Sequence, residues 1–331
     1  MQTSTLFTLL PEDMVCTPDG MAIDKDNNLI LSCPNFANMD MPSCVLKIDR
    51  EAKHIRKWFD VPRNPYTGEA RSMGIEFGPD GDLYMVDNPG WTERPDLVYT
   101  GRILRLRLND EGVVKCTVVA DNMEHPNGIR IWGDYMYVTQ SCMKRQRTES
   151  GKLMSCVYRF PLDAEGIHCT NTLADPDIFL TFITENPVCQ YGVDGIVFDH
   201  QGNLYIGNFG DGAVHKITFN ADGSVKENIL WAKDPQNLKS TDGMSIDRFG
   251  NIYVADFSAN AIARIAPDGT VRRMACSPDT DGFKGELDQP GEPIVWGDQI
   301  IISCFDLVTD DDKVNTAQEI PATMAMLHIE P

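Results

Sequence analysis

The segment Asp194-Gly-Ile-Val-Phe-Asp-His-Gln-Gly-Asn-Leu-Tyr-Ile-Gly-Asn208 carries the pattern that decides the fold. Two short runs of alternating apolar and polar residues flank a polar turn that contains glycine, and this pattern predicts a β-hairpin. The segment Asp242-Gly-Met-Ser-Ile-Asp-Arg-Phe-Gly-Asn-Ile-Tyr-Val-Ala-Asp256 follows the same pattern closely. Further copies begin at Asp19, Met73, Asn127 and, more weakly, Glu292. A hairpin that recurs along the whole chain indicates a repeat architecture.

The copies begin 48 to 67 residues apart, about the length of one four-stranded propeller blade. The segments between copies supply two more apolar runs each, such as Cys44–Arg50 and His54–Phe59 after the first copy. The repeats therefore predict an all-β fold, a six-bladed β-propeller. No linker interrupts the pattern, so we expect residues 1–331 to form a single domain.

The two ends of the chain predict how the last blade is completed. After the sixth hairpin only one further strand remains, Thr323–Ile329, which leaves that blade one strand short. A strand at Thr5–Leu10 precedes the first hairpin and is in excess. We therefore expect the N-terminal strand to lie beside the C-terminal strand in blade six, where it joins the ends and protects an open edge.

The charge and the termini limit the cellular partners. A formal net charge of −20 argues against nucleic acid and anionic membranes as partners. The N-terminus has no signal-peptide pattern, and no apolar stretch reaches the roughly 18 residues of a membrane span, so we expect a cytoplasmic protein. We interpret the ten cysteines as reduced thiols and the acidic run at 310–312 as a solvated loop. A small-molecule substrate is the expected partner, and the oligomeric state is left open.

The first position of each copy is Asp19, Met73, Asn127, Asp194, Asp242 or Glu292. Because the innermost strands of a propeller line its channel, the shared register predicts that these side chains lie at one level. Clustered carboxylates stay ionised only near a cation, and ligands that are all oxygen favour Ca²⁺ first and Mg²⁺ second, with Zn²⁺ and Mn²⁺ left open. The alternative is that each Asp-Gly or Asn-Gly pair simply forms a turn.

Two motifs, Pro126-Asn127-Gly128 and Val193-Asp194-Gly195-Ile196, make the pattern more specific. With the six-fold repeat, they resemble the gluconolactonase/regucalcin (senescence marker protein) family of six-bladed propellers and the related diisopropyl fluorophosphatase type. The resemblance covers nearly the whole chain. It implies one divalent metal at the channel mouth with Asp19, Asn127 and Asp194 as ligands. It also implies that Asp194 acts as the general base or, in the fluorophosphatase variant, as a nucleophile.

This chain departs from the family pattern at two positions. Asp19 stands where the family usually has Glu, and Met73 stands where the family usually has Asn. The arginine that contacts substrate in the sugar-lactone members has a counterpart in Arg71. We expect Arg71, Met73, His125 and Trp91 to contact substrate. Asp242 and Glu292 are interpreted as supporting carboxylates or further ligands.

We therefore expect a calcium-dependent hydrolase of a small lactone, such as a sugar-acid lactone, with metal-polarised water attack assisted by Asp194. Two alternatives stay open: a phosphotriesterase or fluorophosphatase, and a metal-binding propeller without catalysis. Two long insertions, 88–100 and 139–155, are candidates for lids over the substrate. The second insertion is basic and would attract an anionic substrate. Trp91 in the first offers an apolar or sugar-stacking wall.

Overall fold

The computed structural model describes residues 1–309 and 313–329, and nearly all of its regular structure is β-sheet. The strands form six consecutive sheets, which are the blades of a six-bladed β-propeller fold, as the repeat predicts. The chain divides into two compact halves. The N-terminal half comprises residues 11–183, and the C-terminal half comprises residues 1–10 together with the chain from 184 onward. The expectation of a single domain stays a prediction.

The N-terminal half contains the first three blades, each built from antiparallel neighbours. Blade one is β2 (Met21–Ile23), β3 (Leu29–Cys33), β4 (Cys44–Ile48) and β5 (Ile55–Asp60). Blade two is β6 (Ser72–Phe77), β7 (Leu83–Asp87), β8 (Gly101–Asn109) and β9 (Gly112–Met123), with the 3-10 turn η1 (Pro89–Thr92) between β7 and β8. Blade three is β10 (Pro126–Trp132), β11 (Tyr135–Gln140), β12 (Met154–Pro161) and β14 (Ile178–Ile183).

The C-terminal half contains the other three blades. Blade four is β15 (Val193–Phe198), β16 (Leu204–Asn208), β17 (Ala213–Phe219) and β18 (Val225–Lys233). Blade five is β19 (Met244–Ile246), β20 (Ile252–Asp256), β21 (Ala261–Ile265) and β22 (Val271–Cys276), with the 3-10 turn η2 (Phe257–Ala259) after β20. Blade six is β23 (Pro290–Trp296), β24 (Gln299–Cys304), β25 (Thr323–His328) and β1 (Thr5–Leu9).

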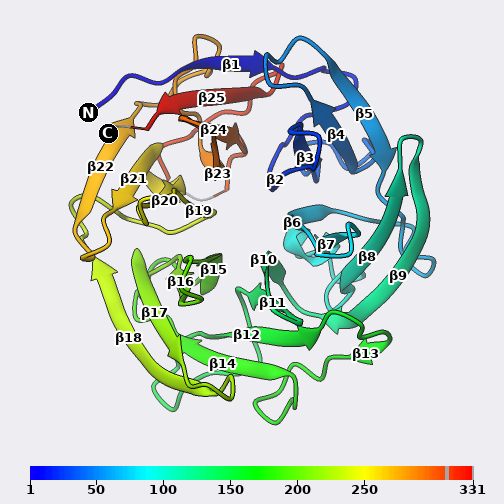
Figure 1. Ribbon diagram of the computed structural model, residues 1–331, viewed down its shortest axis with the longest axis vertical. Coiled ribbons are helices and arrows are strands. Elements are labelled where there is room, and N and C mark those ends of the chain that lie inside the picture. Colours follow the sequence, from blue (N-terminus) through cyan, green and yellow to red (C-terminus); the bar gives the residue numbers. More distant parts are fainter. Residues whose placement is uncertain (310–312, 330–331) are drawn as a thin grey trace. The chain divides into compact units, whose positions relative to one another are not determined.

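The N-terminal strand completes blade six as expected. β1 pairs antiparallel with β25, and the pairing places Thr5 opposite Met326 and Leu9 opposite Thr323. Figure 1 shows the two strands side by side, in blue and red. The prediction that the first and last strands of the chain share one sheet is therefore confirmed, and β25 is not left as an open edge.

The repeated Asp and Asn of each hairpin turn explain why the motif forms this structure. In blade four the Asp199 carboxylate accepts hydrogen bonds from the backbone N–H groups of Gln201 and Asn203, both at 2.9 Å. The hydroxyl of Tyr205 donates to the same side chain at 3.1 Å. Asp247 accepts the equivalent bonds in blade five. An aspartate that bonds to the backbone two residues ahead stabilises a turn locally.

The second strand of several blades differs from the expected alternation. Every residue of β3, β7, β16 and β20 is buried. The reason is that neighbouring blades within each half pack face to face. One core cluster joins Val197 and Val214 of blade four to Val254 and Ala263 of blade five. Strands buried on both faces are apolar throughout, and this contact supplies much of the hydrophobic stabilisation.

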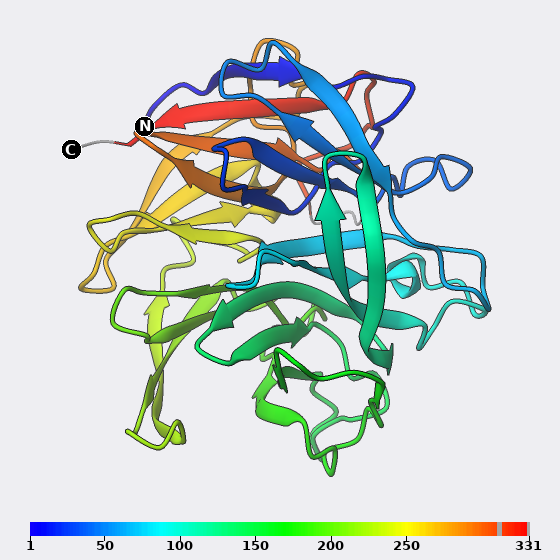
Figure 2. The same cartoon turned by 45° about the vertical axis from the view of Figure 1, so that its right-hand side comes forward.

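Three further features lie outside the repeat. The short strand β13 (Ile167–His168) pairs parallel with β9, so blade two has a fifth strand that the sequence did not predict. β8 and β9 form a long hairpin, teal in Figure 2. The acidic run at 310–312 lies outside the described residues. Among the described residues, no helix has the length and apolar character needed to cross a membrane.

Candidate functional site

In the N-terminal half, the first motif positions of successive blades are neighbours. The innermost strand β6 contacts both β2 and β10. An ideal Cβ atom on Gly74 would lie only 2.7 Å from the carbonyl oxygen of Asn127, and one on Gly20 would collide with the carbonyl of Met73. The motif glycine is therefore required because the next strand passes too close for a side chain. This contact places Asp19, Met73 and Asn127 in succession on adjacent strands.

The C-terminal half repeats this arrangement with three carboxylates. A Cβ atom on Gly195 would collide with the carbonyl of Asp242, and one on Gly243 would lie 2.8 Å from the Cα atom of Glu292. The structure thus brings Asp194, Asp242 and Glu292 into succession in this half. Asp19 and Asn127 belong to the other half, so the shared site of Asp19, Asn127 and Asp194 stays a prediction.

The motif also coincides with an irregularity in strand pairing. In four blades the register between the first and second strands shifts at the motif, between Ser72 and Ile75, Pro126 and Ile129, Val193 and Ile196, and Pro290 and Pro293. Hydroxyl groups on the second strand bond to the backbone there instead. Thr139 Oγ1 accepts from the Gly128 N–H at 2.8 Å, and Ser303 Oγ accepts from the Glu292 N–H at 3.1 Å. Such bulges re-aim side chains and are frequent beside active sites. The glycine within each strand was the available signal.

The donor chemistry of these positions fits a hard divalent cation. Asp19, Asn127, Asp194 and Glu292 are buried, and Asp242 is half-buried. Carboxylates on adjacent strands repel one another, and burial makes the charged forms costly, so a cation would stabilise them. All five positions offer oxygen, which suits Ca²⁺ or Mg²⁺. Met73 is buried as well, but its thioether is a poor ligand for either ion.

Arg71 serves as a clamp on a neighbouring segment. Its guanidinium is buried and donates to the carbonyl oxygens of Pro34 (3.0 Å), Met41 (2.8 Å) and Met39 (2.6 Å). A fourth bond of 3.2 Å reaches the Glu69 carboxylate. These contacts use most of the donors of the fork, so the side chain fixes residues 34–41. Its expected contact with substrate stays a prediction.

His125 is a buried, neutral histidine. Burial, together with the positive charge of Lys144, lowers its pKa to about 3. At neutral pH the ring therefore offers one N–H donor and one acceptor nitrogen but no charge. The neighbouring Glu124 accepts two hydrogen bonds of 3.1 Å from the backbone N–H of Lys144. A substrate contact of His125 would thus be a neutral hydrogen bond, and that contact stays a prediction.

The two long insertions touch one another within the N-terminal half. Lys144 Nζ lies 2.6 Å from Glu93 Oε1, and the Arg145 guanidinium lies over the Tyr99 ring at 4.7 Å. Trp91 stacks on Phe36, with ring centroids 4.5 Å apart. The aromatic face that we expected to meet substrate is therefore used, at least on one side, to pack the first insertion against blade one.

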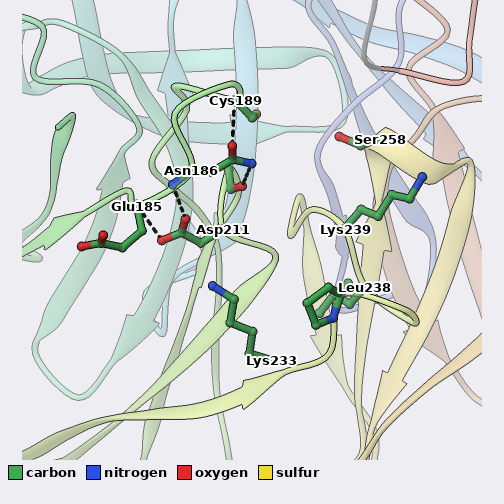
Figure 3. A pocket seen from close by; sticks show the side chains of 10 residues that line it. Glu185, Asn186, Cys189, Asp211, Lys233, Leu238, Lys239 and Ser258 are labelled. Carbon is green, nitrogen blue, oxygen red and sulfur yellow. Dashed lines mark hydrogen bonds between the residues drawn. The ribbon is translucent and has the colours of Figure 1, made fainter.

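A pocket in the C-terminal half was not anticipated from the sequence. It has a volume of about 450 Å³ and is lined by the segments that follow β14 and β16, by the end of β18 with the segment after it, and by Ser258 of η2. Figure 3 shows Lys233, Lys239 and Glu185 along it. The Asp211 carboxylate has a structural role, because it accepts hydrogen bonds from the backbone N–H groups of Glu185 (3.0 Å) and Asn186 (2.8 Å). No repeat residue lines this pocket, so the periodicity carried no signal for it.

The pocket lies at the same end of blade four as Asp194. Val193, the residue before Asp194, pairs with Asn208 at the end of β16. Asn208 pairs with Ala213 at the start of β17, and Ala213 pairs with Lys233 at the end of β18. One edge of the sheet therefore runs from Asp194 outward to the lysine that lines the pocket. Lys233 ends the outermost strand of this edge, three strands from the strand that carries Asp194, and Lys239 lines the same pocket.

Comparisons with known proteins agree on the fold. No protein-family model matches the chain, and no curated protein is similar to it in sequence. Among solved structures, a gluconolactonase from Xanthomonas campestris is 13% identical with a TM-score of 0.58, over 98% of this chain and 95% of that chain. The calcium-binding protein regucalcin from Agrobacterium tumefaciens is 14% identical with a TM-score of 0.60, over 99% and 94%.

The same architecture also carries other chemistry. The PQQ-bound aldose sugar dehydrogenase from Streptomyces coelicolor is 16% identical to this chain with a TM-score of 0.59, over 98% of both chains. A shared fold does not determine a shared function, because function depends on the residues of the site. The chain is thus similar in fold, across nearly its whole length, to six-bladed propellers that include gluconolactonase and regucalcin.

Proposed function

We propose that this protein is a hydrolase of small lactones that depends on a divalent metal, with Ca²⁺ held by Asp19, Asn127 and Asp194. The observation that supports the proposal is the motif itself. Oxygen-bearing side chains open five of the six inner hairpins, and four of these side chains are buried. Buried carboxylates on adjacent strands without a cation would destabilise the fold. The resemblance of the motifs to the gluconolactonase/regucalcin family supports the same ligands.

The reaction assigned to the site is addition of water to the lactone carbonyl. A bound divalent cation would supply Lewis-acid polarisation of the carbonyl oxygen. Asp194 accepts a proton from the attacking water as the new C–O bond forms. The ring C–O bond then breaks, and its oxygen takes the proton back from Asp194 to give a hydroxy acid and the ionised Asp194. Asp242 and Glu292 follow Asp194 in the row of carboxylates and would support it as further ligands or as neighbours of the ligands.

An anionic lactone, such as that of a sugar acid, is the preferred substrate class. Lys233 and Lys239 line the pocket at the Asp194 end of blade four. Arg145 and Arg147 add positive charge to the second insertion, in which Lys144 is already paired with Glu93. In a chain with a net charge of −20, such local positive groups favour binding of a carboxylate or phosphate on the substrate.

Met73 favours a second candidate, a metal-binding propeller without catalysis. This buried thioether occupies the position at which the gluconolactonase/regucalcin family usually has asparagine. One amide oxygen is thereby missing from the row of donors. A protein with this substitution would bind the ion and still lack the group that helps to hold a sugar lactone.

The test is chelator-sensitive hydrolysis. The full chain is assayed against lactones of neutral sugars, lactones of sugar acids and phosphotriesters, with Ca²⁺ and with EDTA. We expect turnover of sugar-acid lactones that EDTA abolishes. Asp194→Asn should lower kcat/KM at least 100-fold with an unchanged circular dichroism spectrum, whereas Asp222→Asn, at an exposed turn, should have no effect. Absence of chelator-sensitive turnover on the whole panel would contradict the hydrolase proposal and favour the binding protein.

A further inference from the structure

Blade six carries an acidic cluster that the motif does not include. Asp288, Asp306 and Glu319 each present a carboxylate oxygen, and the three oxygens lie within 4.8 Å of one another. Asp288 precedes β23, Asp306 follows β24, and Glu319 precedes β25. Pro290 pairs with Cys304, so the first two acids extend from the same edge of the sheet. Acidic clusters are common on protein surfaces, and their burial and partners decide whether they bind a cation.

Asp288 is the unusual member of the cluster. Its side chain is fully buried, and neither carboxylate oxygen has a hydrogen-bond partner among the described residues. Asp306 is 2% exposed and is better satisfied: it accepts the Glu319 N–H at 2.8 Å and the Asn315 side-chain N–H at 3.3 Å. Glu319 Oε2 is buried without a partner as well. A buried carboxylate without donors is strongly destabilising unless a cation or a proton compensates.

Neutral oxygen atoms without partners surround the same place. Thr323 Oγ1 and Asn315 Oδ1 belong to side chains that are each 2% exposed, and neither atom has a hydrogen-bond partner in the described structure. A Cβ atom on Gly282 would lie 2.7 Å from Thr323 Oγ1 and 3.3 Å from Asp288 Oδ2, so both oxygens border the space beside that glycine. The Asn315 amide is tied to Asp306. These unpartnered oxygens are independent of the carboxylates and require the same kind of ligand, a donor or a cation.

The electrostatics favour a positive ligand. Burial and the neighbouring Asp306 and Glu319 raise the pKa of Asp288 to about 8, and burial raises the pKa of Asp306 to about 6. Asp279 and Asp281 add further negative charge. Among the ion pairs seen in residues 1–309 and 313–329, none includes a member of the cluster.

We propose that Asp288, Asp306 and Glu319 bind a divalent cation, Ca²⁺ in preference to Mg²⁺, with the side-chain oxygens of Asn315 and Thr323 as additional donors. Carboxylate, amide and hydroxyl oxygens in a set of five suit the larger, more flexible coordination of Ca²⁺. The ion holds the chain on either side of the β24–β25 connection against the edge of blade six. Its role is structural, and the site neither uses nor requires the motif residues assigned to catalysis.

The experiment separates this site from the proposed catalytic one. Calcium binding by the full chain is measured by calorimetry and by thermal unfolding, in the wild type, Asp288→Asn, Asp194→Asn and Asp281→Asn. The last variant changes an exposed acid of the same loop and serves as the control. For Asp194→Asn we expect one remaining calcium site and a Tm rise of about 5 °C at 100 times its Kd. For Asp288→Asn we expect one bound calcium ion fewer than in the wild type. Most of the Tm rise that comes from the blade-six cluster should be lost with that ion.

Two results would overturn the proposal. In the first, Asp288→Asn binds as many calcium ions as the wild type, with the same Tm rise. In the second, calcium does not stabilise Asp194→Asn, and Asp288→Asn is more stable than the wild type when both are measured in EDTA. That result would mean that the cluster holds a proton and no cation. Asparagine matches the shape of a protonated aspartate, so we expect the variant to fold. If Asp288→Asn did not fold, the number of calcium ions bound by Asp194→Asn would test the proposal by itself. Zero bound ions in that variant would contradict the proposal.

Discussion

A Cβ atom on Gly74 would lie 2.7 Å from the carbonyl oxygen of Asn127, closer than side chains approach in proteins. The glycine of one blade thus allows the backbone of the next blade to pass beside it. Gly243 and Glu292 have the same relationship in the C-terminal half, at 2.8 Å. The residue type that makes the repeat visible in the sequence is therefore the one that brings successive site positions together.

The first prediction concerns this close contact. Gly74→Ala places a methyl group against backbone that cannot move without shifting β10. We expect a loss of about 3 kcal/mol in the free energy of unfolding, at the upper end of what overpacking costs. Urea unfolding measures it, and a displaced β10 would also weaken calcium binding through Asn127.

Gly133→Ala is the matched control for Gly74→Ala. Gly133 has a positive φ of 60°, and nothing lies within 4 Å of a Cβ atom placed on it. This variant bears only the cost of the left-handed backbone, about 1 kcal/mol. If the two alanine variants were equally stable, the steric explanation of the motif glycine would be wrong.

The repeat predicted the architecture well because its cause is local. Each hairpin turn is stabilised by its own side chains, as the bonds of Asp199 to Gln201 and Asn203 show. The pairing of β1 with β25 was also predictable, because a count of strands left one in excess at the N-terminus and the last blade one strand short. β13 could not be predicted, since a two-residue strand carries almost no periodicity.

Contacts between residues that are distant in the sequence form much of the candidate sites, and a single sequence does not reveal such contacts. Arg71, for which we expect a substrate contact, also donates to carbonyls 30 to 37 residues earlier in the chain. Asp288 and Glu319 are also about thirty residues apart in sequence, and no periodic pattern connects them. The motif positions were found because they recur in register. The oxygens of the blade-six cluster were not, because their position results from how two connections fold onto one sheet.

The second prediction concerns a variant that restores the amide oxygen missing at position 73. Met73→Asn replaces a buried thioether by an amide whose oxygen can bind a hard cation or a sugar hydroxyl. We expect the calcium Kd of the proposed catalytic site, or the KM for sugar-acid lactones, to fall several-fold. Calorimetry and steady-state kinetics measure the two quantities.

Met73→Leu controls for the loss of the methionine, since leucine is similar in volume and offers no oxygen. The two variants should differ in calcium and substrate affinity more than in stability. Equal behaviour of the asparagine and leucine variants would show that this position faces neither the ion nor the substrate.

The third prediction tests the clamp formed by Arg71. Arg71→Met keeps much of the buried volume but removes the donors to Pro34, Met39 and Met41. We expect a loss of about 3 kcal/mol, since several buried acceptors lose their partner. Limited proteolysis should cut within 34–43 faster than in the wild type. Arg63→Met changes an exposed arginine that lines a small cavity together with Arg71, and it should change neither measurement. A variant of normal stability with only a raised KM would instead identify Arg71 as a substrate contact.

The fourth prediction concerns pH. Burial lowers the pKa of His215 on β17, while its hydrogen bond to Asn228 and the charge of Asp211 act the other way and Lys233 adds to the lowering. The folded state therefore binds fewer protons than the unfolded chain once the pH falls below about 6.5. The stability that comes from this residue is present above that pH and is lost as the pH falls toward the folded-state pKa.

His215→Asn removes the titrating ring and can still donate to Asn228 Oδ1, which His215 Nδ1 approaches to 3.2 Å. Between pH 7.5 and 5 the urea midpoint of the wild type should fall further than that of the variant. His200→Asn, exposed between β15 and β16, should fall in parallel with the wild type. If His215→Asn also followed the wild type over this range, the lowered pKa of His215 would not be a source of acid sensitivity. Other groups, such as the buried His125 with its lowered pKa, would then have to account for the loss of stability.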